Sequence, residues 1–438
     1  MKKKVSFGII GFGTVGSGVV KLYLDNINEI KKRLDFDIQL KTIAEKTKTS
    51  KEGVKTPKSI KITDDANELI NDPEIDIVVE LVGGKTFAKD FIVSAIKKGK
   101  HIVTANKALL AESGDEIFQL CEKNKVEIGY EASVAGVIPI IRSIKESLAG
   151  DRIESIYGII NGTCNYILTK MTEEGKNFAE VLKEAQDKGY AEADPTLDID
   201  GFDAGHKIAI LTSLSFGKKV SFKDIYIEGI TNITNLDIKF ASQFGYVIKL
   251  LGISKRQGEN IEVRLHPTLI PQNHPLASVR MEYNAVFVKG YAAGSILLYG
   301  KGAGMMPTAS AVLGDVISIA RNIAKGKSGI VPNMGYIPKF IENAKILDIN
   351  NVECKYFIRL MVVDRPGILA SISGILGRKN ISIASVMQEG RNEEGGAVPL
   401  VIITHETQEK KLRDALKEIE KLNITFDKPV FLRIEENL

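Results

Sequence analysis

A short stretch in the middle of the chain gathers carboxylates ahead of one lysine. Glu192, Asp194, Asp198, Asp200 and Asp203 precede Lys207 within sixteen positions. Asp203 and Lys207 are four residues apart in a helix predicted over residues 202–216, so they share one face. Apolar residues near that face predict that the pair is partly buried. A helix salt bridge is the ordinary explanation of such a pair, but the neighbouring carboxylates favour a site for a polar substrate that carries an amine.

A glycine pattern near the start of the chain indicates dinucleotide binding. Gly11, Phe12, Gly13, Thr14, Val15 and Gly16 follow a buried strand predicted over residues 5–10 and open a helix predicted over residues 15–24. The first glycine permits the tight turn, the second lets the backbone approach a pyrophosphate, and the third lets helix and strand pack closely. The helix N-terminus adds N–H groups and the positive end of a dipole. A glycine turn without a ligand is the alternative.

The choice between NAD and NADP stays open on the sequence. Glu45 and Lys46 stand at the end of the second predicted strand, with Glu45 29 positions after Gly16. The carboxylate could accept a hydrogen bond from a ribose 2′-hydroxyl, and the lysine could pair with a 2′-phosphate. A solvated charge pair would do neither. We therefore predict NAD(P) as the cofactor.

Three further motifs lie where predicted strands or turns meet helices. Thr104 and Lys107 stand at the carboxyl end of a parallel strand, where open α/β sheets bind ligands, although Lys107 could equally be a surface cation. Gly162 and Thr163 belong to a turn over residues 161–166 that could bind a substrate carboxylate or only cap a helix. Gly304 belongs to a turn over residues 302–308 that could face a phosphate or simply join two domains.

The order of the predicted elements indicates three modules that position these residues. Strands over residues 5–10, 38–44, 75–82, 101–104 and 126–130 alternate with helices, which predicts an α/β fold with a parallel Rossmann-type sheet. An α+β substrate and dimerisation domain follows, and a helix over residues 309–324 is expected to pack back on the first domain. The tail shows the βαββαβ order of a ferredoxin-like unit. The predicted domains are residues 1–135 with about 303–325, 136–302, a linker over 326–354, and 355–438.

Composition disfavours several other classes of protein. The 438 residues are 44% hydrophobic and 26% charged, which is typical of globular proteins and not of coiled coils or disordered chains. Lys and Arg number 59 against 55 Asp and Glu, an excess too small to favour nucleic-acid binding. The sequence has no apolar run of about 20 residues that would span a membrane. Cys121, Cys164 and Cys354 lack disulfide or zinc spacing, so we expect a cytoplasmic protein.

These motifs, in this order, resemble homoserine dehydrogenase. The matching stretches are residues 8–16, 80–84, 101–110, 130–141, 158–171, 189–211, 244–252, 274–279 and 302–315. The tail around residues 364–367 (Asp-Arg-Pro-Gly) resembles an ACT domain, a module that senses amino acids. The resemblance covers essentially the full chain and is most specific from Tyr190 to Lys207. It implies reversible, NAD(P)-dependent hydride transfer between L-homoserine and L-aspartate 4-semialdehyde, in the biosynthesis of threonine, methionine and isoleucine.

The resemblance also implies a catalytic group. Lys207 would be the acid/base that protonates the developing alkoxide, with Asp203 on the same helix and Lys107 at the cofactor edge. Two lysines held close in a dehydrated cleft are expected to lower each other's pKa. The cofactor would contact the glycine turn over residues 11–16 together with Lys46, Thr104, Lys107 and Gly304.

Further ligands follow from the same resemblance. Asp203, Glu192 and Asp198 would hold the substrate ammonium or hydroxyl, together with Lys207, while Gly162 and Thr163 would present donors to its other end. Fixing both ends of so small a molecule aims its reacting carbon at the nicotinamide. Glu131 with the carbonyls of Val134, Gly136 and Ile138 matches the family's monovalent-cation site, which would hold Na+.

The tail and the assembly complete these expectations. Threonine is the expected effector, bound between paired tails at the Pro366-Gly367 loop and residues 381–388, although the tail could instead serve only in dimerisation. A homodimer or homotetramer is expected. Two rival functions remain on the sequence alone: a non-enzymatic amino-acid sensor, and a related dehydrogenase acting on another compound of the aspartate pathway.

Overall fold

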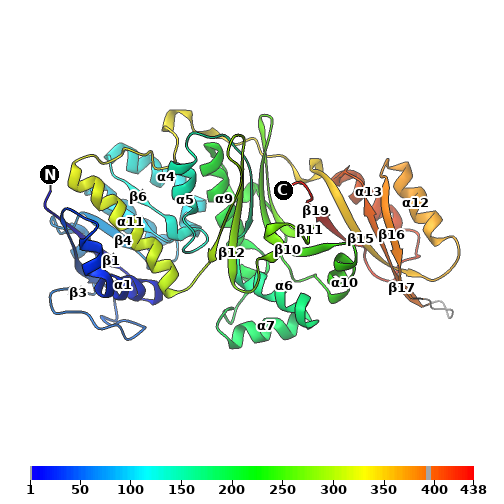
Figure 1. The fold of residues 1–438 in the computed structure, drawn as a ribbon, viewed down its shortest axis with the longest axis horizontal. Helices are drawn as coiled ribbons and strands as arrows, with labels where there is room; N and C mark the ends of the chain where they lie inside the picture. The colour runs from blue at the N-terminus through cyan, green and yellow to red at the C-terminus, as the bar shows by residue number, and fades with distance from the viewer. Residues whose placement is uncertain (1, 391–395) are drawn as a thin grey trace. The chain divides into compact units, whose positions relative to one another are not determined.

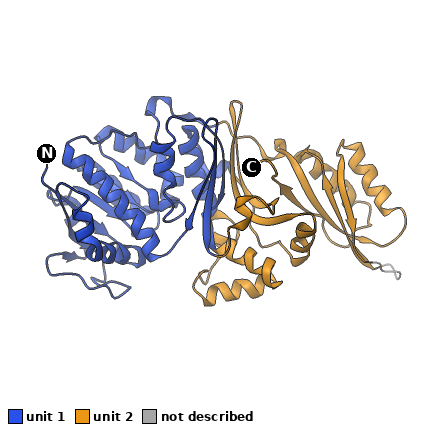
Figure 2. Ribbon diagram, in the orientation of Figure 1, with its two compact units in different colours: residues 1–162, 203–225, 282–344 blue, residues 163–202, 226–281, 345–438 orange. Residues whose placement is uncertain are grey.

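The computed structural model describes residues 2–390 and 396–438. The chain forms two compact units, drawn in different colours in Figure 2. Unit 1 contains residues 1–162, 203–225 and 282–344, and unit 2 contains residues 163–202, 226–281 and 345–438. Because each unit collects segments from several of the modules expected from the sequence, the three-module division stays a prediction.

Unit 1 contains a six-stranded parallel sheet. In spatial order its strands are β3 (Lys61–Thr63), β2 (Asp37–Ala44), β1 (Lys4–Ile10), β4 (Ile77–Glu80), β5 (His101–Thr104) and β6 (Ile128–Gly129). This is the order of a dinucleotide-binding sheet. The first strands are added on one side of β1 and the later strands on its other side. The Rossmann-type prediction is therefore confirmed, although β3 was not expected.

Helices cover this sheet. They are α1 (Thr14–Lys31), α2 (Ala66–Asn71), α3 (Thr86–Lys97), α4 (Lys107–Asn124) and α11 (Met305–Lys325). In Figure 1 the yellow α11 runs beside the blue α1, and a Cβ atom at Gly18 of α1 would lie 2.7 Å from the Met305 carbonyl oxygen. Val312 and Val316 of α11 share one buried cluster with Val5 and Phe7 of β1. The late helix thus packs back on the first sheet, as the sequence predicted.

The rest of unit 1 consists of further strand pairs and a buried helix. β7 (Ile153–Ile159), β12 (Tyr283–Gly290) and β13 (Gly294–Lys301) form antiparallel neighbours, and β8 (Lys218–Lys219) pairs with β14 (Glu342–Asn343). Helix α9 (Phe202–Phe216) is buried along nearly its whole length. The helical segment before β7 consists of α5 (Ile140–Arg142) and a π-helical turn, η2 (Ser143–Ser147).

Unit 2 combines the other middle elements with the C-terminal module. Its helices and strands before residue 345 are α6 (Gly162–Glu174), α7 (Phe178–Asp187), α8 (Thr196–Ile199), β9 (Tyr226–Ile227), α10 (Asn235–Gln243), β10 (Tyr246–Gln257) and β11 (Asn260–Pro271). β10 and β11 form a long antiparallel hairpin. Short 3-10 turns complete both units: η1 (Glu131–Ser133), η3 (Phe222–Asp224), η4 (Pro275–Ser278), η5 (Pro338–Phe340) and η6 (Ile349–Asn351).

The C-terminal module has the predicted βαββαβ order. Its elements are β15 (Glu353–Val363), α12 (Ile368–Arg378), β16 (Ile383–Gln388), β17 (Ala397–Thr404), the short β18 (Thr407–Gln408), α13 (Glu409–Glu420) and β19 (Val430–Ile434). The antiparallel strand order β19-β15-β17-β16 is that of a ferredoxin-like unit. Strand β19 also pairs in parallel with β11, so the module continues a sheet of unit 2. Among the described residues, no helix combines the length and apolar character needed to cross a membrane.

Candidate active site

Asp203 is the centre of the polar cluster in unit 1. One of its carboxylate oxygens accepts hydrogen bonds from Lys207 Nζ at 2.6 Å and from Asn161 Nδ2 at 2.8 Å. Its other oxygen lies 2.8 Å from Lys107 Nζ. Lys207 Nζ also donates at 2.7 Å to the carbonyl of Ile160, the residue directly after β7. The predicted pair of Asp203 and Lys207 on one face of α9 is therefore confirmed, and Lys107 joins it from α4.

Burial and charge act in opposite directions on Asp203. Its side chain is 9% exposed, and this burial alone would raise the pKa of the carboxyl group. The ammonium groups of Lys207 and Lys107 outweigh burial and hold the pKa of Asp203 below its usual range, so the group is a carboxylate at neutral pH. Each lysine faces one oxygen of this carboxylate. The sequence-based expectation considered only the effect of the two lysines on each other's pKa, and it did not include a carboxylate between them.

The two lysines differ in their access to solvent. The side chain of Lys207 is 11% exposed, whereas that of Lys107 is 41% exposed. Lys107 is the first residue of α4, which starts directly after β5 and the N-cap residue Asn106. Asn106 accepts from Leu109 N at 3.1 Å and donates to Gly84 O at 2.6 Å, which fixes the start of this helix. Lys107 thus stands at the carboxyl edge of the parallel sheet, as predicted.

Thr104 is held by a buried carboxyl group. Its Oγ1 donates to Glu80 Oε2 at 2.7 Å, and Glu80 also accepts from the backbone of Val82 at 2.9 Å. Burial raises the pKa of Glu80, and these hydrogen bonds act against the rise. Glu80 and Thr104 end adjacent strands, so their contact fixes the sheet edge that would face a cofactor. A cofactor that binds the Thr104 hydroxyl would have to do so while this hydroxyl donates its hydrogen to Glu80.

The glycine turn has the geometry that a bound dinucleotide needs. Gly11 has φ +103°, and a Cβ there would lie 2.7 Å from the Leu81 carbonyl oxygen. A Cβ at Gly16 would lie 2.1 Å from the Gly11 carbonyl oxygen, whereas a Cβ at Gly13 would meet nothing within 4 Å. Helix α1 starts at Thr14, and no side chain caps it. The turn thus leaves open space at its middle glycine and unpaired N–H groups beside it, which fits a pyrophosphate.

The residues that follow β2 lie against this turn. Glu45 accepts a hydrogen bond from the Phe12 N–H at 2.7 Å, and the exposed Lys46 comes next in the chain. Thr14 Oγ1 donates to Glu52 at 2.8 Å, so the β2–β3 loop also contacts the start of α1. Gly304, with φ +119°, is the N-cap residue of α11 in the same unit. The predicted cofactor residues therefore all belong to unit 1.

The other predicted substrate ligands belong to unit 2, except Gly162, which ends the first segment of unit 1. Thr163 Oγ1 lies 3.2 Å from Asp198 Oδ2 and 2.7 Å from the Tyr190 carbonyl oxygen. Glu192 lies in the loop between α7 and α8 with its side chain exposed. The structure therefore brings Thr163 and Asp198 together, and it brings Asp203, Lys207 and Lys107 together.

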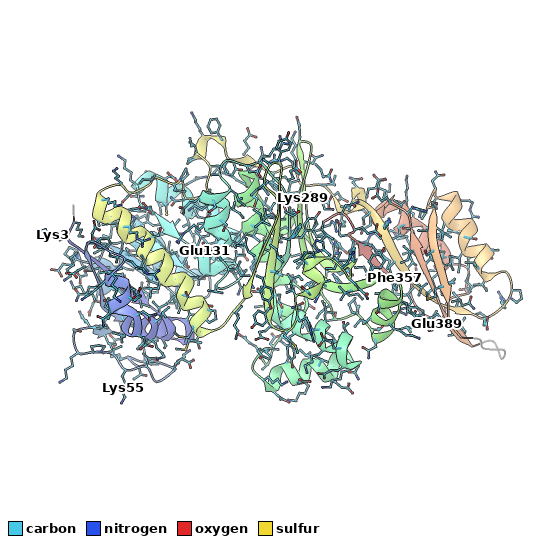
Figure 3. All side chains as sticks on the ribbon, in the orientation of Figure 1. Lys3, Lys55, Glu131, Lys289, Phe357 and Glu389 are labelled. Carbon is cyan, nitrogen blue, oxygen red and sulfur yellow. The ribbon has the colours of Figure 1, made fainter. Side chains whose placement is uncertain are left out.

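The Glu131 carboxylate of the predicted cation site is held by main-chain N–H groups. The Glu131 carboxylate already accepts from the N–H groups of Ile141 and Arg142 at 2.7 and 2.9 Å. Burial and the neighbouring charge of Asp315 raise the pKa of Glu131 to about 7, and its position inside unit 1 is marked in Figure 3. A Cβ at Gly136 would lie 2.6 Å from the carbonyl oxygens of residues 301 and 302, so oxygens crowd this turn. Among the described residues, no group of three His, Cys, Asp or Glu could hold a metal ion.

Sequence reasoning gave no role to Asn161 or Glu80. Asn161 stands in the glycine turn that was singled out, but its bond to Asp203 joins positions 42 residues apart. Glu80 lies inside the predicted strand over residues 75–82 and is the last residue of β4, and a carboxyl group in an otherwise apolar strand was a signal for a structural or functional role. The three cysteines, all within the described part of the chain, are buried and form no disulfide.

Comparison with known proteins gives one family. Residues 11–131 match the profile of the NAD-binding domain of homoserine dehydrogenase, residues 139–317 match the profile of homoserine dehydrogenase, and residues 356–423 match the ACT domain. A homoserine dehydrogenase of Neisseria gonorrhoeae is 45% identical over 436 residues, which is 100% of this chain and 99% of that protein.

Solved structures agree with these matches. The crystal structure of a homoserine dehydrogenase from Thiobacillus denitrificans is similar with a TM-score of 0.93 and 42% identity, covering 99% of both chains. A hyperthermophilic archaeal homoserine dehydrogenase in complex with NADPH is similar with a TM-score of 0.61 and 26% identity, covering 72% of this chain and 98% of that one.

Proposed function

Because the chain belongs to the homoserine dehydrogenase family, we propose that the cluster around Asp203 carries this family's reaction, hydride transfer between L-homoserine and L-aspartate 4-semialdehyde. A single observation carries the proposal. One buried carboxylate holds two lysine ammonium groups within 2.8 Å, at the edge of a dinucleotide-binding sheet. A non-enzymatic sensor would have no use for this arrangement.

Proton transfer is the task of the lysines. NAD(P) bound on the glycine turn supplies the hydride acceptor or donor. When the aldehyde is reduced, the carbonyl oxygen gains negative charge, and Lys207 gives it a proton to form the hydroxyl of homoserine. In the reverse direction the neutral amine takes the hydroxyl proton. Asp203 fixes both lysines, while Lys107 adds positive charge where the oxyanion develops.

The test is turnover with L-homoserine and either NAD+ or NADP+, followed by nicotinamide absorbance. Lys207→Met should lower kcat by several orders of magnitude while NADH binding survives. Lys183→Met is a matched control, because Lys183 forms an i,i+4 pair with Asp187 at 2.6 Å but is exposed. Normal turnover by Lys207→Met, or none by the unaltered protein with either cofactor, would contradict the proposal.

Substrate contacts in unit 2 form a second part of the proposal. Thr163, Asp198 and Glu192 hold the polar ends of the substrate, in support of which Thr163 and Asp198 contact each other at 3.2 Å. Asp198→Asn should raise KM more than it lowers kcat. An unchanged KM would remove Asp198 from the site.

A monovalent cation would be held by carbonyl oxygens near Glu131. The carbonyl oxygens of residues 301 and 302, which lie close to Gly136, support a cation site at Glu131 and the carbonyls of Val134, Gly136 and Ile138. Sodium chloride should then raise the melting temperature and the rate relative to choline chloride at equal ionic strength. Equal values in the two salts would contradict a cation site.

The C-terminal module is proposed to bind threonine. A hollow of about 650 Å³ is lined by residues 362–369 and Gln388, and it includes the Pro366-Gly367 loop. The rate should fall as threonine is added, and the melting temperature should rise. If threonine changes neither, the role of the module in threonine sensing is wrong.

Self-association and location complete the proposal. β13 is an edge strand of unit 1 that exposes Leu297 and Tyr299, and exposed apolar groups on an edge strand favour pairing with a second copy. We expect a homodimer or homotetramer by light scattering, and Tyr299→Lys should weaken this self-association.

Three buried thiols without a disulfide support a reducing, cytoplasmic location.

A further inference from the structure

Glu45 is fixed beside the glycine turn by three contacts. Ala44, the last residue of β2, pairs with Ile10 of β1, and its carbonyl accepts from Gly11 N at 2.9 Å. The Glu45 N–H donates to Thr63 O at 2.8 Å, which holds its backbone against β3. Its Oε2 accepts from Phe12 N at 2.7 Å. The carboxylate is therefore held at the turn and cannot rotate away without losing a backbone hydrogen bond.

Glu45 occupies the position after the second strand where the adenosine ribose of a dinucleotide would bind. In dinucleotide-binding sheets an acidic residue after the second strand accepts a hydrogen bond from the ribose 2′-hydroxyl. The second oxygen of Glu45 accepts no hydrogen bond recorded among the described residues, so it can take this role. NADP carries a phosphate in place of that hydroxyl. The phosphate would bring negative charge next to a carboxylate and remove the donor that the carboxylate needs.

The lysines of the β2–β3 loop could favour NADP, because their positive charge attracts a 2′-phosphate. The loop and the start of β3 contain Lys46, Lys48, Lys51, Lys55, Lys58 and Lys61 against two acids, Glu45 itself and Glu52. Two of the six are paired, Lys48 with Asp64 at 3.0 Å and Lys61 with Glu68 at 2.6 Å. The others are exposed, and Lys55 projects from the loop in Figure 3. Exposed charges are screened over about 8 Å at physiological salt, whereas Glu45 acts at hydrogen-bond distance.

We propose that Glu45 makes this site selective for NAD(H) over NADP(H). The loop lysines then act on the phosphates common to both dinucleotides, and they raise both affinities without setting the preference. This inference rests on the proposed function, because it requires the cofactor to bind at the glycine turn. It goes beyond that function by assigning the choice of cofactor to one side chain.

Direct binding tests the proposal without any substrate. The chain has no tryptophan, so the fluorescence of NADH and NADPH can be titrated with full-length protein against a low protein background. The unaltered protein should bind NADH at least tenfold more tightly than NADPH. Glu45→Gln, which keeps an oxygen for the Phe12 N–H and removes the charge, should reduce this ratio at least tenfold, chiefly by tighter NADPH binding. The kcat/KM values for NAD+ and NADP+ should shift in parallel.

Asp37→Asn provides the matched control. Asp37 is an exposed acid at the opposite end of β2, so its substitution changes the net charge equally and should leave the ratio unchanged. Equal or tighter binding of NADPH by the unaltered protein would overturn the selectivity, as would an unchanged ratio in Glu45→Gln. If neither dinucleotide binds, the proposed cofactor site itself is wrong, which is a distinct result.

Discussion

Replacing Asp203 with Asn tests the central cluster most directly. Asn keeps the size of the side chain and can still bond Asn161, but it removes the charge that both lysines face at 2.6 and 2.8 Å. Hydrogen bonds to charged groups contribute about 1.5–3 kcal/mol each, so the two lysine contacts together contribute roughly 3–6 kcal/mol. If that stabilisation is lost in the transition state, kcat/KM falls about 10²–10⁴-fold.

The same substitution also acts on stability. Lys207 is almost completely buried, and a buried charge that loses its partner costs about 3–5 kcal/mol. The melting temperature of Asp203→Asn should therefore fall, and its rates must be measured well below the start of its own transition. NADH fluorescence titration shows whether the glycine turn remains intact in the same samples. This separates a catalytic loss from a damaged fold.

Asp194→Asn is the matched control. Asp194 belongs to the same acidic stretch, but it is exposed, and within the described ranges it accepts hydrogen bonds only from Thr196, at 3.1 and 2.6 Å. It should change activity and melting temperature little. The reasoning is refuted if Asp203→Asn keeps its activity within threefold, or if Asp194→Asn loses as much activity as Asp203→Asn.

Three further predictions concern stability and cofactor binding. Asp237→Asn should destabilise unit 2 by about 3–5 kcal/mol, seen as a lower melting temperature, because Asp237 and Arg359 form a buried ion pair; an unchanged value would contradict this. Burial lowers the pKa of Lys249 to about 8. Between pH 8 and the ordinary pKa of a lysine, about 10.4, the unfolded chain binds a proton at Lys249 and the folded chain does not. The free energy of unfolding should therefore rise by about 1.4 kcal/mol per pH unit in this range. Lys249→Met should abolish that rise in melting temperature, and a persistent rise would assign it to other groups. Gly16→Ala should abolish NADH binding in calorimetric titration, because the new Cβ would lie 2.1 Å from the Gly11 carbonyl oxygen; tight binding would contradict the assigned turn.

Most of the correctly predicted fold was predicted from patterns within single segments of the sequence. The glycine turn, the α9 pair and the βαββαβ tail each depend on spacing within one segment, which the sequence displays directly. Strand β10 was missed because Lys249 is buried in its middle, where a charge normally indicates a surface position. Strand β13 was missed because many of its side chains are exposed and its apolar pattern is weak.

The candidate site was predictable in its residue types and less so in its contacts. Asp203 and Lys207 share a helix face, so their contact follows from spacing. The bonds of Asp203 to Asn161 and Lys107 join separate elements, and no local pattern gives the distance between them. The same holds for the bond of Glu45 to Phe12, which depends on how the loop after β2 lies against the turn.

The parallel pairing of β19 with β11 has a practical consequence for shortened versions of this chain. Glu435, just after β19, is one of two carboxylates that pair with the buried Arg264 of β11, the other being Glu262, and β19 covers part of the β11 edge. Cutting the chain near residue 345 would therefore leave the buried Arg264 with Glu262 as its remaining carboxylate partner, and it would expose backbone groups of β11 that other chains can join. Deleting the tail should accordingly yield insoluble material, and the proposed response to threonine is better tested through point changes in the hollow near Gly367.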